Sequence, residues 1–137
     1  MAEHPMAAVG VVVVRGNEIL LIKKGRGLFA GQLCIPGGRI EIGESIKETV
    51  HREIREELNI IVSEPEFITY EEHIERDEHG NVVRHFVFFN FKVHYLSGDP
   101  IPGDDACDVV PVSRNELSEV SLSAPTVRTL RAMGYLE

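Results

Sequence analysis

The sequence has 137 residues, of which 43% are hydrophobic, and a formal net charge of −8 from 14 Lys and Arg against 22 Asp and Glu. This length predicts one domain over residues 1–137, with enough apolar material for a core. An acidic balance without a block of Lys or Arg argues against binding of long nucleic acid, whereas a small phosphorylated substrate is allowed.

The cysteines and the N-terminal segment indicate a compartment. Cys34 and Cys107 have no metal-ligand spacing, and a single pair is weak evidence for a disulfide. The first six residues lack the basic start of a signal peptide, and the apolar run 7–14 is too short to span a bilayer. We therefore expect reduced thiols, no membrane segment and a cytoplasmic location.

The first 42 residues predict a hairpin followed by glycine-rich loops. The Val-rich run 7–15 is typical of a strand buried on both faces, and Gly16-Asn17 turns the chain into a second strand over 18–23. A short strand is expected over 33–35. Pro36-Gly37-Gly38 then predicts a tight turn, from which residues 39–42 lead into a helix.

That helix is predicted over residues 46–58. Ser45 and Glu48 have the spacing of a capping box, and Asn59 suits the left-handed conformation that often ends a helix. One apolar stripe repeats every four residues, at Ile46, Val50, Ile54 and Leu58.

The rest of the chain predicts mostly strands. Residues 60–74 and 82–95 are β-rich, with a hairpin loop at 77–81, and a last short strand is expected over 109–112. A helical turn at 113–117 and a closing helix over 124–133 follow. Strands with one helix inserted midway and another at the end predict an α/β fold with a mixed sheet between helices.

The glutamates of the first helix indicate chemistry. On a helical wheel with Ile46 at zero, Glu57 falls near 20°, inside the buried arc, with Glu53 near −20° and Glu56 near −80°. Carboxylates at these spacings repel one another, and Mg²⁺ or Mn²⁺ would relieve the repulsion while also binding phosphates. On the helical wheel alone, a solvated acidic face and a metal site are equally good interpretations.

The wider pattern is more specific. It runs from Gly38 and Glu44 through Arg52-Glu53-Ile54 and Glu56-Glu57 to Asn59-Ile60, and it resembles the Nudix box of the Nudix hydrolases. The family usually has Gly where this chain has Asn59, and Asn tolerates the same positive φ. The resemblance implies an α/β/α sandwich and hydrolysis of a diphosphate linkage with Mg²⁺, or Mn²⁺, as cofactor.

The resemblance also implies roles for individual residues. Glu53, Glu56 and Glu57 would bind the metal with a backbone carbonyl at Gly38, and an ion pair of Glu44 with Arg52 would hold Glu53 in position. The base that accepts the proton from water stays open between Glu53, Glu56 and Asp105, an acidic residue of the loop 103–108. Phosphates are expected to meet Lys23, Arg26, Arg39 or Arg84, and one aromatic residue of the strand 82–95 is available for a base pocket, although Phe86, Phe88, Phe89 and Tyr95 are more typical of a core.

The sequence identifies the substrate less closely than it identifies the reaction. Residues 71–108 look like those of Nudix proteins often described as ADP-ribose pyrophosphatases, which release AMP and ribose 5-phosphate. Against this, many of those enzymes have a proline soon after the box, and here none occurs between Pro65 and Pro100. Alternatives are a MutT-like nucleoside triphosphate pyrophosphohydrolase, a nucleotide-sugar hydrolase, or a sensor domain that binds nucleotides without cleaving them. A homodimer is also common in the family, and an unpaired first strand would offer an edge for it.

Overall fold

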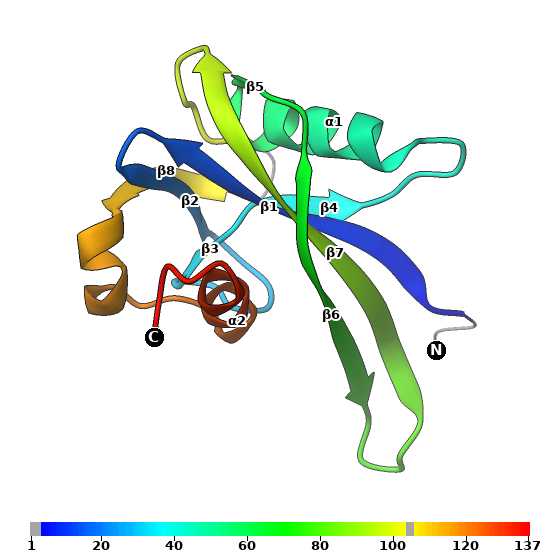
Figure 1. Ribbon diagram of the computed structural model, residues 1–137. Helices are drawn as coiled ribbons and strands as arrows, with labels where there is room; N and C mark the ends of the chain where they lie inside the picture. The colour runs from blue at the N-terminus through cyan, green and yellow to red at the C-terminus, as the bar shows by residue number, and fades with distance from the viewer. Residues whose placement is uncertain (1–3, 104–105) are drawn as a thin grey trace.

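The computed structural model describes residues 4–103 and 106–137 (Figure 1). Its helices are α1 (Ile46–Leu58), α2 (Ala124–Ala132) and the 3-10 helix η1 (Arg114–Glu119). The strands are β1 (Met6–Arg15), β2 (Glu18–Lys24), β3 (Leu33–Cys34), β4 (Gly37–Arg39), β5 (Ile61–Val62), β6 (Glu66–Arg76), β7 (Val82–Ser97) and β8 (Ala106–Ser113).

All eight strands join one mixed sheet with β1 at its centre. β7 runs parallel to β1 on one side, while β2 and β4 pair with it antiparallel on the other side. The remaining pairings are antiparallel, β2 with β3 and β8, and β7 with β5 and β6. The long β6–β7 hairpin extends beyond the helices (Figure 1).

Two cores lie on opposite faces of this sheet. Because successive side chains of a strand point to opposite faces, Val9, Val11 and Val13 pack with Val50, Ile54 and Leu58 of α1, whereas Val12 and Val14 pack with Leu130 of α2. Residues 8–14 are all buried, which confirms a first strand covered on both faces. The predicted α/β/α sandwich with a mixed sheet between helices is confirmed.

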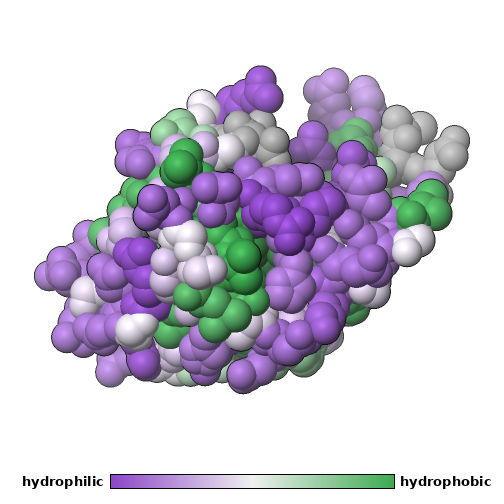
Figure 2. All heavy atoms as spheres, turned by 90° about the horizontal axis from the view of Figure 1, so that it is seen from above, coloured by the Kyte–Doolittle hydropathy of each residue, from purple (hydrophilic) through white to green (hydrophobic). Residues whose placement is uncertain are grey.

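Local sequence signals set the bounds of α1. The capping box is present, with the Glu48 amide donating to Ser45 Oγ at 3.1 Å and the Ser45 amide donating to Glu48 Oε1 at 3.0 Å. Asn59 ends the helix with φ of 58°. In a view from the α1 side, hydrophilic residues cover most of the surface and hydrophobic ones form small patches (Figure 2). None of the described helices is long and apolar enough to cross a bilayer.

The structure contradicts two expectations, the tight turn at residues 36–38 and the unpaired first strand. Gly37 and Gly38 form no tight turn but belong to β4, where they pair with Gly10 and Val9. Only glycine fits there, because a Cβ on Gly37 would overlap the Val9 carbonyl oxygen. The first strand also offers no free edge for a dimer, since β1 has strand partners on both sides.

Candidate functional site

Helix α1 presents its glutamates at different depths. The wheel placed Glu57 inside the buried arc, but Glu53 is the buried glutamate, 8% exposed, and Glu57 is only partly buried. Ile46 is 39% exposed, whereas Thr49 is fully buried. The buried arc is therefore rotated towards Glu53, the side on which α1 contacts β4.

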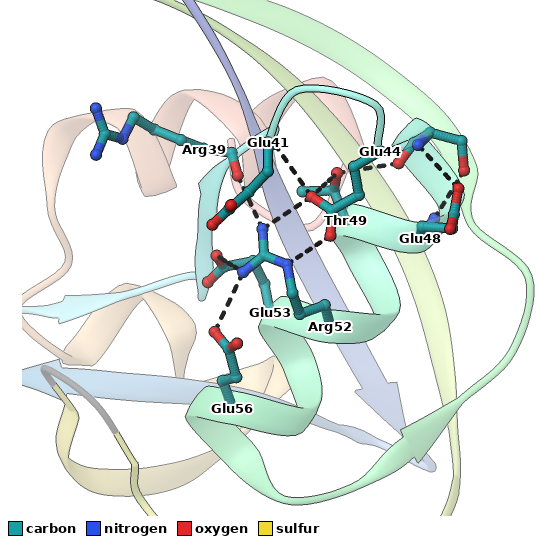
Figure 3. Close-up of polar contacts among 9 residues, drawn as sticks. Arg39, Glu41, Glu44, Glu48, Thr49, Arg52, Glu53 and Glu56 are labelled. Atoms are coloured by element: carbon teal, nitrogen blue, oxygen red, sulfur yellow. Dashed lines mark hydrogen bonds and ion pairs between the residues drawn. The ribbon is translucent and has the colours of Figure 1, made fainter.

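Arg52 connects the acidic residues of this region (Figure 3). Its Nε donates to Glu44 Oε2 at 2.6 Å, and its Nη1 donates to Glu53 Oε1 at 2.8 Å and to Glu56 Oε2 at 3.2 Å. Its Nη2 donates to the carbonyl oxygen of Arg39 at 3.0 Å, while the Arg39 side chain points away from the cluster (Figure 3). One guanidinium thus ties α1 to both β4 and the loop before the helix.

These contacts keep both partners charged. The hydrogen bond from Arg52 is the largest cause that lowers the pKa of Glu44, to about 2, and the Glu41 amide and the Thr49 hydroxyl lower it further. Hydrogen bonding to Glu44, and then to Glu53, raises the pKa of Arg52. Glu44 and Arg52 therefore both stay ionised at neutral pH.

The lowered pKa of Glu44 predicts a loss of stability in acid. An unfolded glutamate titrates near 4.5, so the stabilisation is complete above that pH and is lost as the pH falls towards about 2. We expect Glu44→Gln to lower the urea midpoint at neutral pH, with a gap to the parent protein that narrows between about pH 4.5 and 2. Urea unfolding over this range measures the gap, and a gap independent of pH would contradict the ion pair as its cause.

Two glycines bring backbone close to the glutamates. The Gly37 amide donates to Glu57 Oε2 at 3.2 Å, and a Cβ on Gly38 would overlap the carboxylate of Glu53. Within residues 4–103 and 106–137, no three His, Cys, Asp or Glu side chains already surround a common point for a metal ion. The donor set still fits a hard divalent ion, because carboxylates and carbonyls are the oxygen ligands such ions prefer. Asp105, the loop candidate for a base, lies outside the described residues.

A cavity of about 700 Å³ opens beside these groups. Glu53 and Glu57 line it and Glu56 does not, so Glu56 lies at the outer side of the cluster with Arg52. Among the described residues, five lysines and arginines line it: Lys24, Arg26, Arg39, Arg84 and Arg128. Lys23, a candidate from the sequence, is not among the lining residues, whereas Lys24 is: Lys24 lies two positions after Ile22 on the face of β2 that borders the cavity, and strand alternation turns Lys23 to the other face.

The aromatic strand divides between core and cavity. Phe86 and Phe88 line the cavity and stack on one another, with ring centroids 5.4 Å apart. Phe89 and Tyr95 pack instead against the core beneath α1, as expected of core residues. One strand therefore supplies an aromatic surface to the same cavity that Glu53 and Glu57 border.

Several lining residues carried no sequence signal. Arg128 Nε contacts both carboxylate oxygens of Glu71, at 3.0 and 2.9 Å, although the two residues are far apart in the chain. Asn90, only 3% exposed, also lines the cavity. His73 borders it too, and its Nε2 is a buried atom without a hydrogen-bond partner in the described part of the chain. No local motif marks such residues, because the fold alone brings them together.

Known proteins share this fold and sequence pattern. The chain is 32% identical over 118 residues to an ADP-ribose pyrophosphatase of Methanocaldococcus jannaschii, an alignment that covers 86% of this chain and 68% of that protein. It is 31% identical over 116 residues to the nucleoside triphosphatase NudI of Salmonella arizonae, covering 81% and 82% of the two chains. The crystal structure of a MutT NUDIX hydrolase from Burkholderia pseudomallei superposes with a TM-score of 0.82 at 29% identity, covering 95% of this chain and 98% of that one.

A family model described as the NUDIX domain matches residues 4–131, nearly the whole chain and every part of the site described above. The chain therefore belongs to the Nudix family and is a hydrolase that acts on pyrophosphate bonds.

Proposed function

We propose that this protein hydrolyses ADP-ribose to AMP and ribose 5-phosphate, with Mg²⁺ as its cofactor and Mn²⁺ as a substitute. One observation carries the proposal: a single cavity joins Glu53 and Glu57 to the stacked rings of Phe86 and Phe88. A substrate in which a diphosphate is joined to a nucleoside with a planar base fits such a cavity. The similarity to the ADP-ribose pyrophosphatase of Methanocaldococcus jannaschii supports this substrate.

The acidic end of the cavity would hold the metal. Glu53, Glu56, Glu57 and the carbonyl of Gly38 are the proposed ligands. A divalent ion bound there supplies positive charge to the diphosphate and makes a water molecule more acidic. Arg52 would hold Glu53 in place through its 2.8 Å contact.

The cations of the cavity would bind the phosphates. Arg26 and Arg39 line the cavity from the segments before β3 and at the end of β4, and Arg84 lines it from β7 beside Glu75, 3.6 Å away. Hydrolysis adds the oxygen of water to one phosphorus and breaks its bond to the bridging oxygen, while a carboxylate accepts the proton. Glu53 and Glu56 are the described candidates for that carboxylate, with Asp105 as the third.

Product analysis over a substrate panel tests the proposal. The purified chain would be incubated with Mg²⁺ and ADP-ribose, dinucleotides, nucleotide sugars or (deoxy)nucleoside triphosphates, and the products separated by ion-exchange chromatography. We expect ADP-ribose to give the highest kcat/KM, with AMP and ribose 5-phosphate in equal amounts. A higher kcat/KM for another class would replace ADP-ribose as the substrate.

A nucleoside triphosphate is the second candidate. The similarity to the nucleoside triphosphatase NudI, which covers 82% of that protein, favours it. In this case the panel would release a nucleoside monophosphate and pyrophosphate. A nucleotide-sugar hydrolase would show sugar phosphate release, and a sensor domain would bind one member of the panel tightly without turnover.

The setting of the protein is also proposed. Both cysteines are free thiols, Cys34 buried and Cys107 exposed, which suits a reducing compartment, and we place the protein in the cytoplasm. A homodimer is proposed from the family resemblance, and a monomeric mass by light scattering would refute it.

A further inference from the structure

Asn90 is a buried polar residue in the floor of the cavity. It lies on β7 with its side chain on the same sheet face as Phe86 and Phe88, since these positions alternate by two along the strand. The face is the one covered by α2, because Asn90 Nδ2 donates to Thr129 Oγ1 at 2.8 Å. A buried amide between a helix and two aromatic rings needs partners for both of its polar atoms.

Its amide can take only one orientation. The Thr129 hydroxyl donates its single hydrogen to the carbonyl oxygen of Pro125 at 3.0 Å, so it accepts from Asn90. Nδ2 therefore points to α2, and Oδ1 points to Gly10, where a Cβ would overlap it. In the described part of the chain no donor reaches Oδ1, which leaves a hydrogen-bond acceptor in the floor of the cavity.

This acceptor lies at a suitable distance from the acidic end. Gly10 pairs with Asn90 on one side and with Gly37 on the other, and neighbouring strands are about 4.8 Å apart. Two strand spacings, about 10 Å, thus separate the backbones of Asn90 and Gly37. The Gly37 amide contacts Glu57 of α1, whereas the Asn90 side chain lies on the α2 face, so a nucleoside that reaches both would pass over the edge at β4, within the cavity that Glu57 and Asn90 both line.

We propose that Asn90 is a specificity-determining residue, whose Oδ1 accepts a hydrogen bond from the amino group of an adenine base resting against Phe86 and Phe88. This rests on the proposed function, because it places the nucleoside of the substrate in the same cavity. Aromatic rings bind any base by stacking and do not separate purines. An oriented acceptor does, since a 6-oxopurine places a second acceptor against Oδ1 and leaves both without a donor.

Equilibrium binding of products tests the proposal without turnover. AMP and IMP differ in the 6-substituent of the purine and in the N1 proton that accompanies it. We expect isothermal titration calorimetry on the whole chain to show AMP bound at least about tenfold more tightly than IMP. A ratio near one in the parent protein overturns the proposal, and no variant is needed for that result.

Two variants locate the cause of the preference. Asn90→Leu removes the acceptor and is expected to bring the AMP to IMP ratio towards one. Thr129→Val removes the group that orients the amide, so the ratio is expected to fall while AMP still binds. Asn115→Leu, at an exposed asparagine of η1, is the matched control and should keep the parent ratio.

The remaining outcomes are also decisive. If Asn90→Leu stays folded by circular dichroism and weakens AMP and IMP equally, Oδ1 contacts a group common to both, such as a ribose hydroxyl, and the proposal fails. If the chain prefers AMP but hydrolyses no ADP-ribose, the proposed function fails and this inference stands. Equal kcat/KM for ADP-ribose and its inosine analogue would reject the inference and leave the proposed function intact.

Discussion

Glu57→Gln is expected to lower kcat by at least about a hundredfold, the scale of losing a catalytic acid or base group. The neutral amide keeps the shape of the side chain but removes the charge that would attract a divalent ion. Its oxygen can still accept the hydrogen bond from the Gly37 amide, 3.2 Å away in the parent protein, so the fold should survive. Initial rates at saturating substrate over a Mg²⁺ titration measure both kcat and the metal requirement.

Glu56→Gln is the companion variant, with the same expected loss. Glu56 is the more exposed of the two, with 45% of its side chain accessible, and its Arg52 contact is one of several that Arg52 makes. Glu64→Gln is the matched control, because Glu64 is exposed and, among the described residues, its carboxylate pairs with Lys47 at the surface. Near-normal turnover in both Glu56→Gln and Glu57→Gln would contradict the assignment of the metal site to α1.

Gly38→Ala is expected to reduce kcat by about a hundredfold, because a shift of about 1 Å at reacting groups has that effect. The added Cβ would overlap the carboxylate of Glu53, which Arg52 holds from the other side. Either the glutamate or β4 must move, and both belong to the proposed metal site. Steady-state kinetics with circular dichroism as a check of folding provide the measurement.

Gly16→Ala is the control for this glycine. Gly16 has φ of 60°, so alanine is strained there, but no atom lies near its Cβ position. We expect a modest loss of thermal stability and unchanged kcat. Equal loss of kcat in both variants would attribute the effect of Gly38→Ala to general destabilisation.

The sequence predicted the elements whose signals are local. The capping box and Asn59 gave α1 its bounds to the residue, and the Val-rich run gave a strand buried on both faces. The burial of individual glutamates on α1 was harder to predict, because a helical wheel carries no information about the strand β4 that packs beside Glu53. The pairing of Gly37 and Gly38 with β1 was missed for a related reason. Glycine is common both in tight turns and in strands that pack closely against another backbone, so its presence does not distinguish the two.

The rest of the cavity depends on contacts between distant parts of the chain. Glu71 meets Arg128, and Asn90 meets Thr129, only because α2 lies across the β6–β7 hairpin. A charge or an amide in a strand gives no sign of such a partner. Lys23 and Lys24 are adjacent and so point to opposite faces of β2. Strand periodicity alone could not show which face borders the cavity until the pairing of β2 was known.

The parallel register of β1 with β7 also governs when the protein can fold. Each pair joins residues 80 positions apart, from Met6 with Phe86 to Val14 with His94. Contacts of such long sequence separation form slowly, because loop closure must precede them. A nascent chain that has left the ribosome only as far as α1 already contains every glutamate of the box and the strands β2 and β4, yet the other side of its central strand still lacks its parallel partner β7. Until β7 emerges, that Val-rich strand is the segment most exposed to aggregation, and chaperones would be expected to bind it first.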